Sequence, residues 1–91
     1  METLAAKIVI AFFYMVNGDL VSYTVSDFEA LAQEERLPTG LTCATLIQNV
    51  RFIEDVRRDL TPGESMRAAC FTTDDLMVLG EPDVNVEINR N

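Results

Sequence analysis

The chain has 91 residues, a formal net charge of −8 and a hydrophobic content of 48%. Its length predicts one small domain over residues 1–91 with a thin core. Fifteen acidic residues against seven basic ones exclude direct binding of nucleic acid or of an anionic membrane surface, because both need clustered lysine and arginine.

The first recognisable element is Ile8–Val16, a run of nine apolar residues without a break. It does not alternate with polar residues and is mostly β-branched or aromatic, which predicts a strand buried on both faces. Asn17-Gly18 and the β-prone segment Leu20–Val25 follow, so we expect a hairpin with a type I′ turn. A helix over Glu2–Val16, capped by Gly18, is the competing interpretation.

The same run is too short to cross a membrane, which takes about 20 apolar residues. Glu2 accompanies Lys7 before it and no small-x-small cleavage site follows, so we expect no signal peptide and a cytoplasmic protein. Cys43 and Cys70 are then expected to be reduced, buried thiols. A disulfide between them requires a fold that brings them together, which the sequence leaves open.

Ser26 and Glu29 have the spacing of a capping box, which predicts a helix over residues 27–37 that ends before Pro38. The apolar side chains on its inner stripe are Phe28, Leu31 and Ala32.

The segment 42–60 has two interpretations. Apolar residues at helical spacing favour one long helix, whereas a shorter helix to Gln48 followed by a strand over 49–56 is the alternative. Thr61-Pro62-Gly63-Glu64 fits either a type II turn or a second capping box. We expect the two choices to be linked, so that a long helix is followed by a third helix over 64–71 and a strand by a hairpin.

The C-terminal residues predict a second hairpin, with strands at Leu76–Leu79 and Val84–Ile88 around a turn at 80–83. The last segment alternates strictly between apolar and polar residues, which is typical of a half-exposed edge strand. The predicted fold class is α+β: a mostly antiparallel sheet, formed by an N-terminal hairpin plus a C-terminal hairpin, with two or three helices packed on one face.

The chain has few residues suited to catalysis. It has no histidine and no glycine-rich phosphate loop, and two cysteines alone cannot complete a structural zinc site. The alternating oxygens from Asp83 to Asn89 lack the glycine and the final glutamate of a calcium loop. Asp74-Asp75 is interpreted as a solvated turn. We therefore expect no enzyme activity, no metal and no cofactor, and a carboxylate enzyme using Asp75 is the weakest alternative.

The helices of so short a chain can cover only one face of the first strand. We expect them to cover the row with the bulkier side chains, which consists of Ile8, Ile10, Phe12 and Tyr14. The opposite row would stay exposed and form the oligomer interface of a homodimer or hetero-complex. Its residues are Val9, Phe13 and Met15.

We expect a non-catalytic protein-binding factor, of the inhibitor or immunity type, that docks on a basic surface of a partner protein, including one that normally holds nucleic acid. The alternative is a small structural subunit that self-assembles through its apolar sheet face, with the acids keeping it soluble. The acidic residues predicted to bind the partner are Asp27, Glu29, Glu34, Glu35, Asp74, Asp75, Glu81 and Asp83.

Overall fold

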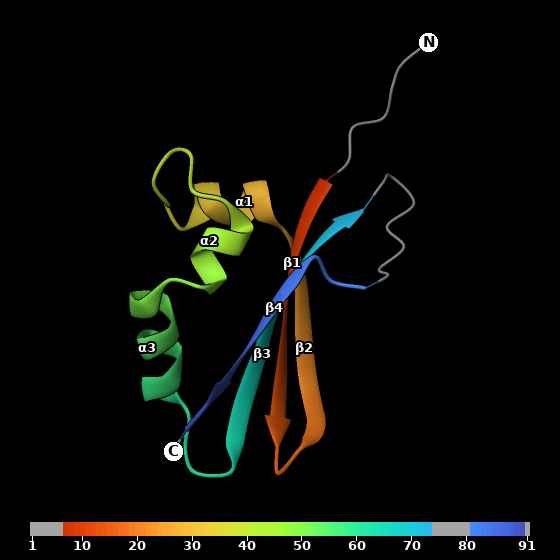
Figure 1. Ribbon diagram of the computed structural model, residues 1–91, viewed down its shortest axis with the longest axis vertical. Coiled ribbons are helices and arrows are strands. Elements are labelled where there is room, and N and C mark those ends of the chain that lie inside the picture. Colours follow the sequence, from red (N-terminus) through yellow and green to blue (C-terminus); the bar gives the residue numbers. More distant parts are fainter. Residues whose placement is uncertain (1–6, 74–80, 91) are drawn as a thin grey trace.

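The computed structural model describes residues 7–73 and 81–90. Its elements, in chain order, are β1 (Lys7–Val16), β2 (Asp19–Asp27), α1 (Phe28–Glu34), α2 (Cys43–Ile47), α3 (Val50–Asp59), β3 (Glu64–Thr73) and β4 (Val84–Asn89). The strands form one antiparallel sheet in the order β2-β1-β3-β4, and the helices lie against one of its faces (Figure 1). The α+β fold that the sequence predicts is therefore confirmed. Within these residues, none of the helices combines the length and apolar content that crossing a membrane requires.

The predicted N-terminal hairpin is confirmed. Asn17 and Gly18 adopt φ angles of 52° and 86°, as a type I′ turn requires, and Val16 pairs with Asp19 across it. One irregularity follows, because the pairing leaves Val21 as an extra residue on β2, which makes a β-bulge. The helix interpretation is wrong for residues 7–16, since this segment pairs with a strand on each side and satisfies its backbone there.

The sheet face under the helices holds the main core. Ile10 of β1 is fully buried, and Phe12 packs against the same cluster from the next position on this face. Burying a side chain such as Ile10 contributes about 1.5–3 kcal/mol. The buried residues of this cluster are Ile10, Phe28, Cys43, Ile47, Ala68 and Cys70.

The opposite face, which we call the outer face, has a smaller cluster made of Val9, Ala11, Ala69 and Phe71. Val9 lies directly opposite Phe71 on β3 and is only 1% exposed, so the prediction that Val9 stays uncovered is wrong. Phe13 and Met15, its predicted companions, are half-buried. Ile8, which is expected under the helices, is 40% exposed, so this part of the prediction is wrong.

Helix α1 begins one residue later than the capping box predicts. Asp27 is the N-cap and its Oδ1 accepts a hydrogen bond from the Ala30 amide at 3.2 Å, whereas Ser26 is still paired with Ile10 in the sheet. The helix ends at Glu34, and Arg36 takes a positive φ of 56° that stops it before the predicted end at 37. The predicted inner stripe is confirmed, because its three residues pack on the main core.

The segment 42–60 is helical, as its apolar spacing predicts, but it forms two helices and not one. Asn49 lies at the break, where its Oδ1 accepts hydrogen bonds from the amides of Arg51 at 2.9 Å and Phe52 at 3.2 Å. An asparagine that caps a new helix interrupts the old one, which apolar spacing alone does not reveal.

The prediction that a helical segment 42–60 is followed by a third helix over 64–71 is wrong. Thr61–Glu64 closes as a turn, with the Glu64 amide donating to the Thr61 carbonyl at 2.9 Å and Gly63 at a φ of 91°. A strand, β3, follows the helices, because its ten residues all pair with β1.

Strand β4 pairs with β3 at the edge of the sheet, as predicted for an edge strand. Its alternation is also confirmed, with Ile88 buried and Val84 and Val86 packed against the main core. The second hairpin is expected to pair β4 with Leu76–Leu79, whereas among the described residues β4 pairs with Ser65–Cys70 of β3. Leu76–Leu79 itself and the pair Asp74-Asp75 lie outside the described residues.

Cys43 and Cys70 are buried, as expected, but they form a disulfide, so the expectation of reduced thiols is wrong. Cys43 is the first residue of α2, and the fold places this end of the helix over Cys70 on β3. Disulfides are typical of oxidising compartments, so the cysteines no longer support a cytoplasmic location.

Candidate functional site

Strand β2 has an unusual concentration of exposed apolar side chains. All its residues are exposed except Ser26, which is half-buried. The large apolar residues on it are Leu20, Val21, Tyr23 and Val25, with exposed fractions of 55%, 59%, 62% and 39%. We call these four residues the β2 surface. Exposed apolar patches of this kind mark protein interfaces more often than single exposed residues do.

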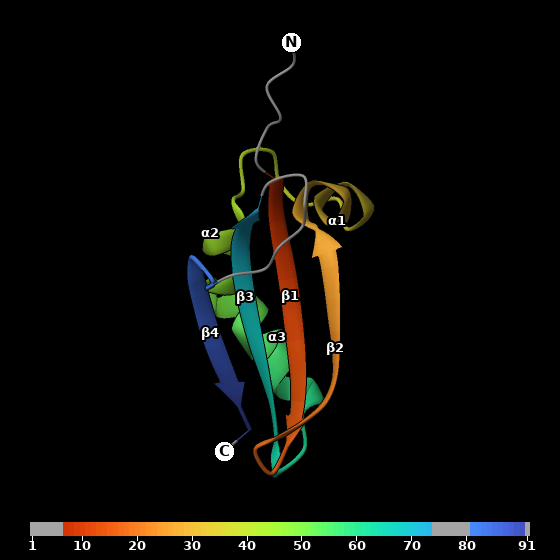
Figure 2. The ribbon, with the colours of Figure 1, turned by 90° about the vertical axis from the view of Figure 1, so that its right-hand side faces the viewer.

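No helix covers Tyr23 and Val25, because they lie on the outer face, opposite Phe13 and Ala11, and the helices pack against the other face of the sheet. Helix α1 meets β2 near the end of the strand, α2 packs on β3 and β4, and α3 packs on β4 and reaches β1 through Phe52. Figure 2 shows the helix-free side of the sheet, with β2 running along one margin and only α1 near its end.

The β2 surface continues onto β1. The rings of Phe13 and Tyr23, which are directly opposite in the strand pairing, lie 6.2 Å apart between centroids. Met15 is half-buried and pairs with Leu20. Two of the three residues predicted as an oligomer interface, Phe13 and Met15, therefore border the exposed strand, while Val9 is enclosed in the outer-face cluster.

The sequence predicts β2 as the second strand of the hairpin, and its pattern also contains a signal for an exposed apolar surface. Val21, Tyr23 and Val25 alternate with Ser22, Thr24 and Ser26, and no charged residue stands between Asp19 and Asp27. A neutral alternating strand has one apolar side, and an interface is expected where no helix covers it.

The predicted acidic face is divided by the fold into two groups. Asp27 caps α1, and Glu29, Glu34 and Glu35 follow on or just after that helix, next to the end of β2. Glu81 and Asp83 precede β4, which is three strand spacings from β2, or about 14 Å. The remaining predicted members, Asp74 and Asp75, are outside the described residues.

Asp83 has a structural role. Its amide donates to the Cys70 carbonyl at 2.8 Å, and its carboxylate accepts a hydrogen bond from the Thr72 hydroxyl. These contacts hold the chain against β3 where β4 begins. The group around α1 is therefore the better candidate for a partner contact.

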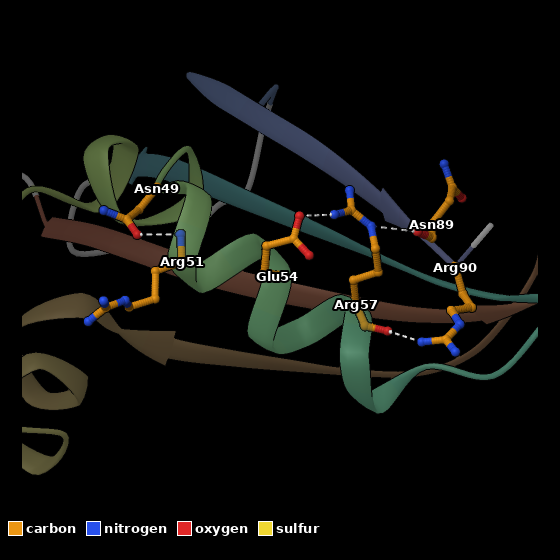
Figure 3. Close-up of polar contacts among 6 residues, drawn as sticks. All are labelled: Asn49, Arg51, Glu54, Arg57, Asn89 and Arg90. Atoms are coloured by element: carbon orange, nitrogen blue, oxygen red, sulfur yellow. Dashed lines mark hydrogen bonds and ion pairs between the residues drawn. The ribbon is translucent and has the colours of Figure 1, made fainter.

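Helix α3 carries a polar contact to the C-terminal strand (Figure 3). The Arg57 guanidinium donates to the Asn89 carbonyl at 3.1 Å and pairs with the Glu54 carboxylate at 2.6 Å. Arg90 returns a hydrogen bond to the Arg57 carbonyl at 3.5 Å. The arrangement ties α3 to the end of β4 and has the geometry of a structural contact.

At the turn before β3, the Tyr14 hydroxyl donates a hydrogen bond to the Glu64 carboxylate. This bond, with a second from the Thr61 amide at 2.6 Å, lowers the pKa of Glu64, and the bond to Glu64 raises the pKa of Tyr14. The Tyr14 hydroxyl and the Glu64 carboxylate thus connect β1 to the first residue of β3. In the part of the chain that the structure describes, no three acidic, histidine or cysteine side chains gather as a metal site would require.

Comparison with protein-family models, with curated proteins and with solved structures finds no match. The function of the chain therefore has to be inferred from its own surfaces. Of these, the β2 surface is the exposed apolar one next to a group of acids, among which Asp27 also caps α1.

Proposed function

We propose that this chain is a non-catalytic protein-binding factor, of the inhibitor or immunity type, that docks on a basic surface of a partner protein. The observation that supports it best is the neutral, exposed strand from Leu20 to Ser26, which ends in Asp19 on one side and Asp27 on the other. Burial of the apolar side chains would supply affinity, and the acids would supply orientation and a fast encounter.

Charge favours a basic partner over a second copy of the chain. Two copies of β2 paired antiparallel in full overlap would place Asp19 opposite Asp27 at both ends. Like charges directly opposite in a strand pair are destabilising, and each copy carries a net charge of −8. A partner with lysine or arginine at these two positions would replace both repulsions with attractions.

A second candidate is self-assembly through the outer face, with the acids keeping the assembly soluble. The pairing of Phe13 with Tyr23 favours it, because these rings extend the apolar area from β2 onto β1. Such an assembly would pack the outer faces of two copies against each other and would not pair one β2 with the other.

Affinity capture from the native host, with the mass of the purified complex measured, distinguishes the candidates. We expect the wild-type chain to recover one basic protein, and the variant Tyr23→Ser/Val25→Ser to lose it. Val50→Ser is the matched control, because Val50 is 73% exposed but lies on α3, away from β2.

The salt dependence of the purified complex provides the second measurement. The association rate should fall roughly tenfold or more between 50 and 500 mM salt, because exposed charges are screened over a shorter distance. A rate independent of salt, or a complex whose mass is a multiple of this chain alone, would contradict the proposal.

A further inference from the structure

We infer that the partner is held by strand addition, in which an extended segment of the partner pairs with the open edge of β2 and adds a fifth strand to the sheet. The inference rests on the proposed function and concerns how the partner is recognised. β2 is the first strand in the sheet order, so one of its two edges has no strand beside it among the described residues. Figure 2 shows that this edge is also free of helix along most of its length.

The direction of the backbone groups follows from one hydrogen bond. The Asn17 amide donates to the Gly63 carbonyl at 2.7 Å, which places the backbone groups of odd-numbered β1 residues toward β3. Because these groups alternate along an antiparallel strand, the even-numbered residues of β1 bond to β2. Their partners on β2 are Ser22, Thr24 and Ser26.

The β2 residues between those partners direct their backbone groups away from β1. Tyr23 and Val25 therefore direct their amide and carbonyl groups to the open edge, which makes four backbone groups available to an incoming strand. Their side chains lie on the outer face, since Tyr23 is opposite Phe13 and Val25 is opposite Ala11. The same two residues thus offer both backbone hydrogen bonds and apolar contact, which is how edge strands bind extended peptides.

The length, apolar pattern and charge of the open β2 edge define the partner segment that would pair with it. Leu20–Ser26 spans about 23 Å, which matches seven extended residues. The bulge at Val21 disturbs the spacing near the turn, so regular pairing runs from Ser22 to Asp27. The segment should carry apolar residues at alternate positions and a basic residue at each end, opposite Asp19 and opposite Asp27 or Glu29.

A designed peptide tests this inference on the full chain. The probe is the nine-residue peptide KKVTVTVKK, and the control is EEVTVTVEE, which has the same centre and opposite charge. Amide hydrogen exchange is measured by NMR. At a peptide concentration ten times Kd, exchange at Tyr23 and Val25 should slow about tenfold, while Ser22 and Thr24, already bonded to β1, should change little. The acidic peptide should bind at least tenfold more weakly.

Variants at one position test the backbone contribution. Val25→Pro removes an amide that faces the open edge and leaves the bonds to β1 in place, so it should weaken peptide binding tenfold or more. Val25→Thr keeps the amide and should bind within about threefold of the wild type. If Val25→Pro does not fold, the exchange pattern of the wild-type chain decides alone.

Three results would overturn strand addition by a basic segment. The first is that KKVTVTVKK does not bind at 1 mM. The second is that it binds without slowing amide exchange at Tyr23 and Val25. The third is that, without peptide, amide exchange at both residues becomes slower as the protein concentration rises. The last result would assign the edge to a second copy. The capture experiment is independent of the peptide, so strand addition can fail while the proposed function stands.

Discussion

Cys43 and Cys70 join the first residue of α2 to the middle of β3, with their Cα atoms 6.1 Å apart. Since the chain has two cysteines, this is its one disulfide cross-link, and it joins the helical layer to the sheet in addition to the main chain. The bond spans 27 positions of the sequence and includes α3 and the turn at Thr61–Glu64.

Breaking this bond should lower the free energy of unfolding by about 3.5 kcal/mol, because a closed loop of this length restricts the unfolded chain. Urea denaturation of the oxidised protein, with and without reductant, measures the difference. Cys43→Ala/Cys70→Ala should match the reduced wild type to within about 1 kcal/mol. A denaturation midpoint that does not move on reduction would contradict the disulfide.

Asn49→Ala should destabilise the protein by about 1 kcal/mol, because it removes the oxygen that accepts two amides at the start of α3. Gln48→Ala is the control, since Gln48 is the preceding exposed residue and ends α2. The control should change the free energy of unfolding by less than about 0.5 kcal/mol. Equal effects of the two substitutions would show that the Asn49 cap does not contribute.

Arg57→Ala should cost about 1 kcal/mol, because it removes both the hydrogen bond to the Asn89 carbonyl and the pair with Glu54 on a half-exposed side chain. Arg58→Ala should be nearly neutral. The Arg58 side chain is 74% exposed, and within the described residues its ion pair is with Asp55, at 3.4 Å. The loss of stability in the two variants is compared by thermal unfolding under identical conditions. A larger loss for Arg58→Ala than for Arg57→Ala would contradict the role assigned to Arg57.

The pair Tyr14–Glu64 should make stability depend on pH at both extremes. The pKa of Glu64 is lowered from its usual 4.5, so its contribution is complete above pH 4.5 and is lost as the pH falls through the lowered value. The pKa of Tyr14 is raised from 10.0, so its contribution is complete below pH 10 and is lost as the pH rises through the raised value.

Tyr14→Phe should therefore flatten the alkaline dependence and reduce the acid dependence, as followed by urea midpoints from pH 2 to 6 and from pH 9 to 12. Tyr23→Phe is the control, because it removes a hydroxyl from an exposed ring and leaves Glu64 untouched. Identical pH profiles for the Tyr14→Phe variant and the wild type would exclude a contribution from this hydrogen bond.

Those parts of the fold that depend on neighbouring residues could be predicted from the sequence. The Asn17-Gly18 turn fixes the hairpin because its backbone angles suit few other residues, and the alternation of Val84–Ile88 defines an edge strand. The inner stripe of α1 follows from helical spacing alone. The fold class follows from these elements together.

The rest depends on contacts between distant parts of the chain. Cys43 meets Cys70 only once α2 lies over β3, and no local pattern encodes that. Val9 packs in one buried cluster with Phe71, its partner across β1 and β3, and these two residues are 62 positions apart. The sequence predicts one acidic face from the acids at α1 and at the start of β4, because it does not reveal how far apart the sheet places them.

Strand β1 is bordered by two strands that are made at very different times. β2 follows it after two residues, whereas β3 is complete only at Thr73, 57 residues after Val16. At a synthesis rate of about 5–20 residues per second, the ribosome takes roughly 3–11 s to supply that second neighbour. During this interval the newly made hairpin has unpaired backbone on both sides, and it is then most vulnerable to aggregation and most accessible to chaperones.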